Sequence, residues 1–103
     1  MASLHLRIPM RSGAREQHYL LEKQEALLGR SPDCDVVVPC IYVSRRHARI
    51  IRVGDQFYIE DMGTLDGTRV NGSGIGNQIR ERTLLHDKDE IWFADSVVVQ
   101  FRE

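Results

Sequence analysis

The sequence predicts an all-β protein, folded as a β-sandwich or a β-barrel. Apolar residues recur at every second position far more clearly than at helical spacing, as in Leu4, Leu6 and Ile8. Short segments rich in β-branched and aromatic residues follow one another at roughly ten-residue spacing, bounded by Gly, Pro, Asp or Asn. Because the sequence contains no convincing amphipathic helix, these strands must bury their apolar faces against one another.

The expected strands follow in chain order. A first strand over 4–8 is followed by a polar turn over 11–16 and a strand over 17–22. After a turn near Lys23, further strands are expected at 26–30, 35–38, 47–53, 56–61, 68–71, 79–85, 90–94 and 96–101. Gly54-Asp55 and Asn71-Gly72 predict tight turns between strands, since these residue types tolerate positive φ.

Composition limits the classes of partner. The chain has 103 residues, with 14 Lys and Arg against 15 Asp and Glu. This balance gives no global attraction to nucleic acid or to an anionic membrane, so neither is expected as a partner. The sequence lacks an apolar run of the roughly 20 residues that a membrane span needs, and also a signal peptide. We expect one domain over 1–103, cut from a longer protein.

Cysteine usage favours a reducing compartment. Cys34 and Cys40 are too few for a disulfide framework, and no CxxC motif occurs. Both are expected to fill space as small apolar groups. Together with the absence of a signal peptide, this predicts a cytoplasmic, intracellular protein.

Two segments carry most of the chemistry. Residues 29–47 read GRSPDCDVVVPCIYVSRRH, and residues 61–72 read DMGTLDGTRVNG. The first segment supplies the cations Arg30 and Arg45 with the hydroxyl of Ser44 between them, and the second is a glycine-rich turn. Guanidinium groups and hydroxyls match the charge and oxygens of a phosphate, so these loops together predict a local phosphate site.

A sandwich fold could bring the loops of this site together. The loops of a sandwich gather at the ends of its sheets, so 30–35, 39–46 and 62–67 can converge although they lie apart in sequence.

A catalytic triad of Ser44, His47 and Asp61 is an alternative, because triads are defined by geometry and not by order. The sequence has no GxSxG nucleophile motif, which argues against that alternative.

The order and spacing of these motifs resemble a forkhead-associated (FHA) domain. The matching pattern is Gly-Arg, then Ser-Arg-x-His, then Asp-x-x-Thr-x-Asp-Gly-Thr-x-Val-Asn-Gly, and the resemblance covers nearly the whole chain. It implies a two-sheet β-sandwich of about eleven short, mostly antiparallel strands. It also implies a module that binds phosphothreonine peptides through loops at one end.

The resemblance assigns roles to named residues. Phosphate contacts are expected from two arginines, two hydroxyls and one backbone amide: Arg30, Arg45, Ser44, Thr64 and Leu65. Contacts to the peptide are expected from Tyr42 and Asp66. Structural support of the site is expected from Gly29, His47, Gly67, Thr68 and Asn71.

Asp66 departs from the family pattern, which commonly has asparagine at this position. An asparagine side chain both accepts and donates hydrogen bonds, whereas an ionised aspartate only accepts. Its charge also repels a phosphate that lies within the ~8 Å screening length of physiological salt. We therefore expect Asp66 to weaken or alter peptide binding, while Arg30 and Ser44 preserve phosphate recognition.

The leading prediction is a non-enzymatic phosphothreonine-dependent interaction module, whose partner is a substrate of a serine/threonine kinase. Neither a cofactor nor a metal is expected, since the HDKDE segment at 86–90 reads as a solvated turn. The alternatives are a phosphate-independent docking domain of the same fold, which Asp66 favours, and a hydrolase that uses Ser44 and His47.

Overall fold

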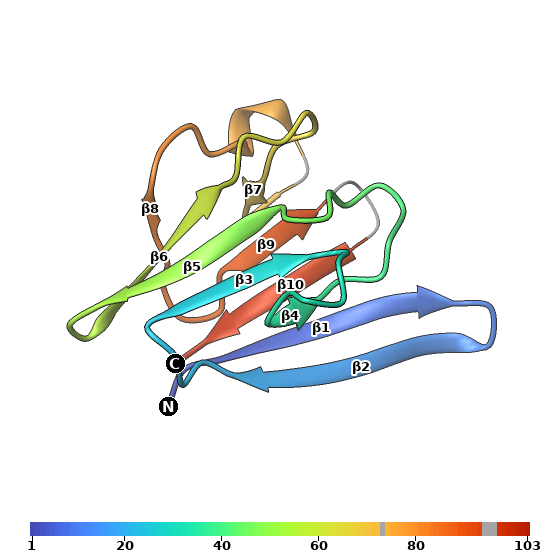
Figure 1. Cartoon of the computed structure of the whole chain (residues 1–103), viewed down its shortest axis with the longest axis horizontal. Coiled ribbons are helices and arrows are strands. Elements are labelled where there is room, and N and C mark those ends of the chain that lie inside the picture. Colours follow the sequence, from blue (N-terminus) through green and yellow to red (C-terminus); the bar gives the residue numbers. More distant parts are fainter. Residues whose placement is uncertain (73, 94–96) are drawn as a thin grey trace.

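The computed structural model describes residues 1–72, 74–93 and 97–103, and these residues form two β-sheets packed face to face. Each sheet contains five strands, and the only helical element in these ranges is a single 3-10 turn, η1, at Ile75–Asn77. Figure 1 shows the two sheets as stacked layers, with the N- and C-termini together at one end and the β1–β2 hairpin extending at the other. In the described ranges no helix is long and apolar enough to cross a membrane.

One sheet has the strand order β2-β1-β10-β9-β7. Its strands are all paired antiparallel and have these bounds: β1 Ser3–Met10, β2 Gly13–Leu20, β7 Arg69–Val70, β9 Glu90–Phe93 and β10 Val97–Arg102. The first and last long strands of the chain, β1 and β10, therefore lie side by side at the centre of this sheet.

The other sheet has the strand order β4-β3-β5-β6-β8. Its strands are β3 Glu25–Gly29, β4 Val36–Val37, β5 Ala48–Val53, β6 Gln56–Asp61 and β8 Thr83–Leu84. Strands β3 and β4 are parallel, and the other pairs of this sheet are antiparallel. Because β3 and β5 are neighbours, the loops that follow β3 and precede β5 leave the sheet at the same end.

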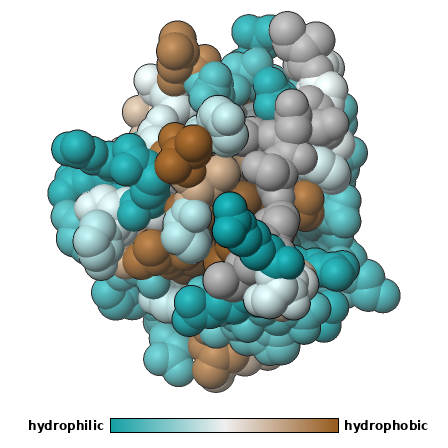
Figure 2. Space-filling model, turned by 90° about the vertical axis from the view of Figure 1, so that its right-hand side faces the viewer, coloured by the Kyte–Doolittle hydropathy of each residue, from teal (hydrophilic) through white to brown (hydrophobic). Residues whose placement is uncertain are grey.

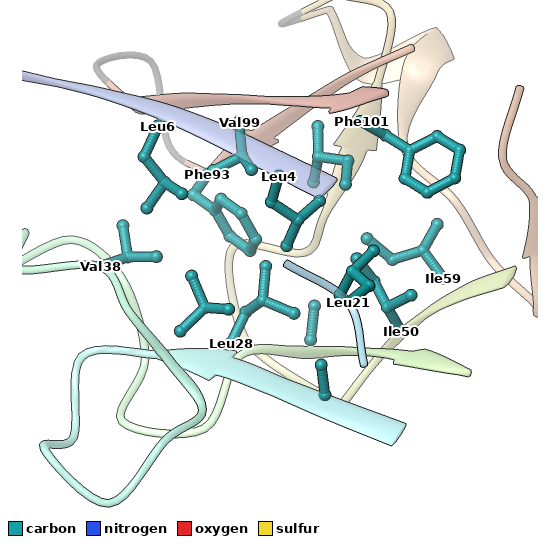
Figure 3. Close-up of a cluster of buried hydrophobic side chains, with 14 of the residues drawn as sticks. Leu4, Leu6, Leu21, Leu28, Val38, Ile50, Ile59, Phe93, Val99 and Phe101 are labelled. Atoms are coloured by element: carbon teal, nitrogen blue, oxygen red, sulfur yellow. The ribbon is translucent and has the colours of Figure 1, made fainter. Parts of the chain in front are cut away.

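The core lies between the two sheets and follows from the period-two pattern. Leu4 and Leu6 of β1 face Leu28 of β3 and Ile50 of β5 across the interior (Figure 3). The rings of Phe57 and Phe101 are tilted against each other with centroids 5.5 Å apart. Each fully buried aliphatic or aromatic side chain contributes about 1.5–3 kcal/mol relative to exposure, so this layer is the main source of stability.

The all-β sandwich prediction is confirmed, with ten strands in the described ranges where about eleven were expected. The polar segment 11–16 is not all turn: only Arg11 and Ser12 link the strands, and β2 begins at Gly13. Pairing along the whole of β1 keeps these polar residues in a strand despite their composition. The predicted strand at 79–85 shrinks to Thr83–Leu84. Ala94 and Ser96, which were placed in strands, lie outside the described residues.

Candidate functional site

Main-chain hydrogen bonds tie the loop after β3 to the loop before β5. The Arg30 amide donates to the Ser44 carbonyl over 3.0 Å, and the Ser31 amide donates to the Arg45 carbonyl over 3.1 Å. The Arg30 side chain adds a bond from its Nε to the Val43 carbonyl, 3.1 Å long. These bonds place Arg30, Ser44 and Arg45 beside one another, although Arg30 and Ser44 lie fourteen residues apart in the sequence.

Gly29 makes this close approach of the two loops possible. A Cβ atom at this position would overlap the carbonyl group of Arg45, so any other residue would push the loops apart. The φ of Gly29 does not lie in the left-handed region, and its requirement for glycine is therefore one of space and not of backbone conformation.

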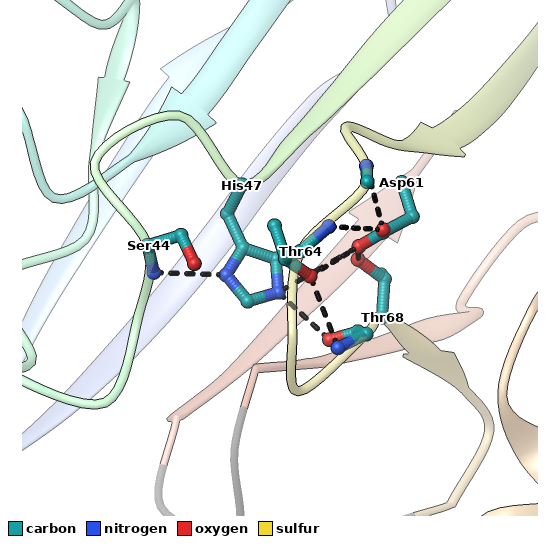
Figure 4. A network of polar contacts seen from close by, with 7 residues as sticks. Ser44, His47, Asp61, Thr64 and Thr68 are labelled. Carbon is teal, nitrogen blue, oxygen red and sulfur yellow. Dashed lines mark hydrogen bonds and ion pairs between the residues drawn. The ribbon is translucent and has the colours of Figure 1, made fainter.

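His47 connects the Ser44 loop to the loop that precedes β7. The His47 ring is fully buried, and its Nδ1 accepts a 3.0 Å hydrogen bond from the Ser44 amide (Figure 4). Its Nε2 lies 2.7 Å from the Gly67 carbonyl. Since an amide only donates and a carbonyl only accepts, the ring is neutral with its proton on Nε2. The edge of the ring packs against Phe93, with centroids 4.9 Å apart.

The Asp61 carboxylate holds the second loop of the site, which runs from Asp61 to β7. This carboxylate accepts hydrogen bonds from the amides of Gly63 and Thr64 and from the hydroxyls of Thr64 and Thr68, at 2.7–2.9 Å (Figure 4). Burial raises the pKa of Asp61, but the hydrogen bonds from Thr64 and Thr68 outweigh burial and leave the pKa below its ordinary value. The ionised carboxylate therefore stabilises this loop.

The Thr64 hydroxyl forms its hydrogen bonds within its own loop. The hydroxyl donates to Asp61 over 2.7 Å and accepts from the Gly67 amide over 3.0 Å. A phosphate oxygen would need the proton that Asp61 already receives. The expected phosphate contact of Thr64 is therefore replaced in this structure by a contact that shapes the loop.

The arginines of the site differ in whether they form an ion pair. Arg46 forms an ion pair of 3.1 Å with Asp33. Arg30 and Arg45 are exposed and, among the residues that the structure describes, neither forms an ion pair. In the same ranges the Ser44 hydroxyl makes no hydrogen bond, although the Ser44 backbone is held at both its amide and its carbonyl. Two guanidinium groups and one hydroxyl are thus available to an anion.

The tip of the second loop projects into solvent beside these groups. Leu65 is 99% exposed and Tyr42, on the neighbouring loop, is 62% exposed. Asp66 is exposed too, and no hydrogen bond or ion pair joins it to another residue in the described part of the chain. Figure 2 views this end of the molecule and shows isolated apolar side chains between hydrophilic ones.

Gly67 and Thr68 belong to the same network, whereas Asn71 does not. Gly67 has φ of 73°, and Thr68 is fully buried with its hydroxyl on Asp61. Asn71, at φ of 61°, instead bonds Asp89 and the amide of Glu90. It ties the segment after β7 to the segment before β9, and in the ranges described it makes no hydrogen bond to the loops that carry Arg30, Ser44 and Thr64.

Reasoning from the sequence missed the role of Asp61, which it treated only as a possible triad member. The spacing Asp-x-x-Thr carries the signal, because a carboxylate that accepts from the amides two and three residues later forms a recognisable local turn. The triad itself is not assembled. Both ring nitrogens of His47 are occupied by backbone groups, and its Nε2 lies 3.9 Å from Asp61.

A two-sheet β-sandwich whose charged loops meet at one end defines a class of binding module. The family model of the FHA domain matches residues 26–94, and the chain belongs to the FHA family. The expectation drawn from the sequence motifs is confirmed at this level.

Individual relatives were found among curated proteins and solved structures. The chain is 38% identical over 73 residues to an oxoglutarate dehydrogenase inhibitor of Corynebacterium jeikeium, covering 71% of this chain and 47% of that protein. It therefore spans about half the length of this relative. A structure from an analysis of phosphothreonine-dependent FHA domain interactions superposes with a TM-score of 0.75 at 27% identity, covering 98% of this chain and 96% of that one. Mycobacterium tuberculosis EmbR in complex with a low-affinity phosphopeptide superposes with a TM-score of 0.75 at 29% identity, covering 99% of this chain and 24% of that one.

Proposed function

We propose that this chain is a phosphothreonine-dependent protein-interaction module, which captures a phosphorylated segment of a partner protein without changing it chemically. The observation that carries the proposal is the placement of Arg30, Ser44 and Arg45. Their backbones are hydrogen-bonded together, while the arginines lack ion-pair partners and the serine hydroxyl lacks a hydrogen bond among the described residues. Such a preorganised set of donors loses little freedom when an anion binds.

In the proposed complex, Arg30 and Arg45 neutralise the phosphate and Ser44 donates a hydrogen bond from its hydroxyl. A phosphothreonine carries about −1.5 to −2 charges at neutral pH and presents three strong acceptor oxygens. The exposed amide of Leu65 supplies a further donor. Thr64 acts indirectly, because its bonds to Asp61 and Gly67 hold the loop that presents Leu65.

Tyr42 and Asp66 would contact the peptide beside the phosphate. Tyr42 offers an exposed aromatic surface to a neighbouring peptide side chain. The Asp66 carboxylate accepts a hydrogen bond from a peptide amide but cannot donate to a peptide carbonyl. We expect this loss of one donor to set the affinity of the domain below that of a relative with asparagine.

Phosphate-independent docking by the same loops is the second candidate, and the exposed carboxylate of Asp66 is the observation that favours it. A negative charge beside the cations favours a partner that carries its own positive group. A hydrolytic function has less support, because His47 has no free nitrogen to take a proton from the Ser44 hydroxyl.

Fluorescence anisotropy with three matched oriented peptide libraries tests the proposal, one each with phosphothreonine, phosphoserine and unphosphorylated threonine at the fixed position. We expect binding to the first library, weaker binding to the second and none to the third. Binding that is equal for phosphorylated and unphosphorylated libraries would contradict phosphate recognition and favour the docking alternative. Absence of binding to all three would contradict phosphopeptide recognition and favour phosphate-independent docking.

A further inference from the structure

The edges of the two sheets differ sharply in length. Three edges are formed by β4, β7 and β8, which have two residues each. The fourth edge is β2, which has eight residues and pairs only with β1 in the described part of the chain. Long open edges present unpaired backbone groups that pair readily with another strand, and proteins commonly shorten, bulge or cover them. Strand β2 is neither short nor bulged, since its register with β1 is continuous.

The open backbone groups of β2 can be assigned from its hydrogen-bond pattern. The Leu21 amide donates to the Ala2 carbonyl over 3.0 Å, so Leu21 faces β1. In a regular antiparallel pair, residues alternate between facing the partner strand and facing away. The amides of Ala14, Glu16 and His18 therefore point to the open edge, where a further strand can bond them.

We propose that β2 is a homodimerisation strand, which pairs antiparallel with β2 of a second copy around a two-fold axis through Gln17. In this register Glu16 of each copy lies opposite His18 of the other, and Arg15 lies opposite Tyr19. The first pair joins a carboxylate to an imidazole, and the second places a guanidinium beside an aromatic ring.

The outer members of the ladder are complementary as well, because Ala14 lies opposite Leu20, which is 52% exposed in the single chain. Sliding one strand by two residues preserves the bonding pattern, but one direction places Glu16 against Glu16 and the other moves Glu16 from His18 to a position opposite Leu20. Like charges directly opposite each other destabilise a strand pair. The sequence of β2 is thus self-complementary in one register, and this is why a second copy is the occupant that fits the edge.

The dimer would leave the phosphate site open. His47 of the site contacts Phe93, and Phe93 pairs with Val97 at the start of β10. The next residue of β10, Val98, pairs with Arg7 of β1. The C-terminal half of β1 therefore lies at the same end of the molecule as the site. An antiparallel pair of β2 strands therefore directs the two sites to opposite ends of the assembly. Figure 1 shows β2 at the rim of its sheet, with only β1 beside it. Dimerisation does not depend on phosphate binding and can be tested without any peptide.

Sedimentation velocity over a wide range of protein concentrations tests the dimer, with a reversible monomer–dimer equilibrium as the expected result. His18→Glu would place two pairs of like charges in the interface, and we expect the dissociation constant to rise at least about tenfold. Within its own chain residue 18 lies opposite His5, so the new carboxylate is not repelled by β1. His18→Lys places an ammonium group opposite Glu16 and should dimerise at least as tightly as the wild type.

A backbone variant tests the strand pairing itself. His18→Pro removes an amide that points to the open edge, which an edge strand tolerates because no bond to β1 is lost. We expect a folded monomer, with the fold checked by circular dichroism. Arg52→Glu, on β5 of the other sheet, is the matched control and should leave dimerisation unchanged. A wild type that stays monomeric at all concentrations would overturn the proposal, as would a dimer that survives both His18→Glu and a folded His18→Pro.

Discussion

The imidazole of His47 holds the backbone of Ser44, because its Nδ1 accepts the Ser44 amide proton over 3.0 Å. The same ring is bonded through Nε2 to the Gly67 carbonyl, and so one buried side chain fixes two loops that are far apart in sequence. The Ser44 hydroxyl makes no hydrogen bond in the part of the chain that the structure describes. A histidine is suited to this position because a neutral imidazole provides one acceptor and one donor on opposite sides of a rigid ring.

Replacing His47 should therefore damage both stability and binding. His47→Ala removes a fully buried ring and leaves the Ser44 amide and the Gly67 carbonyl without partners. Each unsatisfied buried group costs about 1–3 kcal/mol, so we expect the free energy of unfolding to fall by roughly 2–6 kcal/mol in denaturant titrations. His86→Ala is the control, since its exposed side chain should change stability by less than about 0.5 kcal/mol. Equal stability of the two variants would contradict the structural role of His47.

Gly29 gives a second test of how the loops are held together. Gly29→Ala would force its methyl group against the Arg45 carbonyl, and overpacking of this kind costs about 1–3 kcal/mol. The loops must separate to relieve the contact, so Arg30 and Arg45 would also move apart. We expect lower stability together with weaker phosphopeptide binding. Gly76→Ala is the matched control, because nothing lies within 4 Å of its added Cβ and its φ is ordinary.

The convergence of the Arg30 and Ser44 loops could be predicted from the sequence because its motifs are local and ordered. Gly29-Arg30 and Ser44-Arg45 could be assigned from residue types at strand ends, and the structure places them beside each other. The role of the Thr64 hydroxyl could not be predicted in the same way. A hydroxyl can donate to a ligand or to its own loop, and only the position of the Asp61 carboxylate decides between them. The sequence likewise did not indicate that Arg46 is paired with Asp33 while Arg45 is not.

The bounds of some strands could be predicted from the sequence, whereas those of others could not. Strands rich in β-branched residues, such as β5 and β10, lie close to their predicted bounds. The segment 79–85 also carries apolar residues, yet only Thr83–Leu84 pairs with β6. Whether a short segment forms a strand depends on the length of edge that its neighbour offers, and that is a property of the whole sheet.

Arg30 is expected to supply much of the affinity for a phosphopeptide. A hydrogen bond to a charged group contributes about 1.5–3 kcal/mol, so Arg30→Ala should weaken binding at least about tenfold. Arg30→Lys keeps the charge but loses the paired donors of the guanidinium, and an intermediate affinity is expected. Anisotropy titrations would measure both. Arg52→Ala, on a strand end remote from the loops, is the control, and an Arg30→Ala protein that binds as tightly as this control would contradict the proposed role.

Asp66 can be tested by restoring the residue that is common in the family. Asp66→Asn removes a negative charge beside the phosphate and adds a donor for a peptide carbonyl. One net hydrogen bond contributes about 0.5–1.5 kcal/mol, which predicts phosphopeptide binding that is roughly threefold to tenfold tighter. Asp55→Asn removes the same charge from the Gly54-Asp55 turn and should leave the affinity unchanged. If Asp66→Asn weakens binding, the carboxylate itself recognises the partner, and the docking alternative gains support.

The depressed pKa of Asp61 predicts how stability depends on acidity. Its folded-state pKa lies below the ordinary aspartate pKa of 3.8, so the unfolded chain binds the proton more readily. The contribution of Asp61 is then fully present above the unfolded pKa and is lost as the pH falls through the folded pKa. Denaturant titrations over this acid range should show the wild type losing stability more steeply than Asp61→Asn, which has no carboxylate to protonate. Parallel curves for the two proteins would mean that the carboxylate of Asp61 does not hold the Thr64–Thr68 loop through its charge.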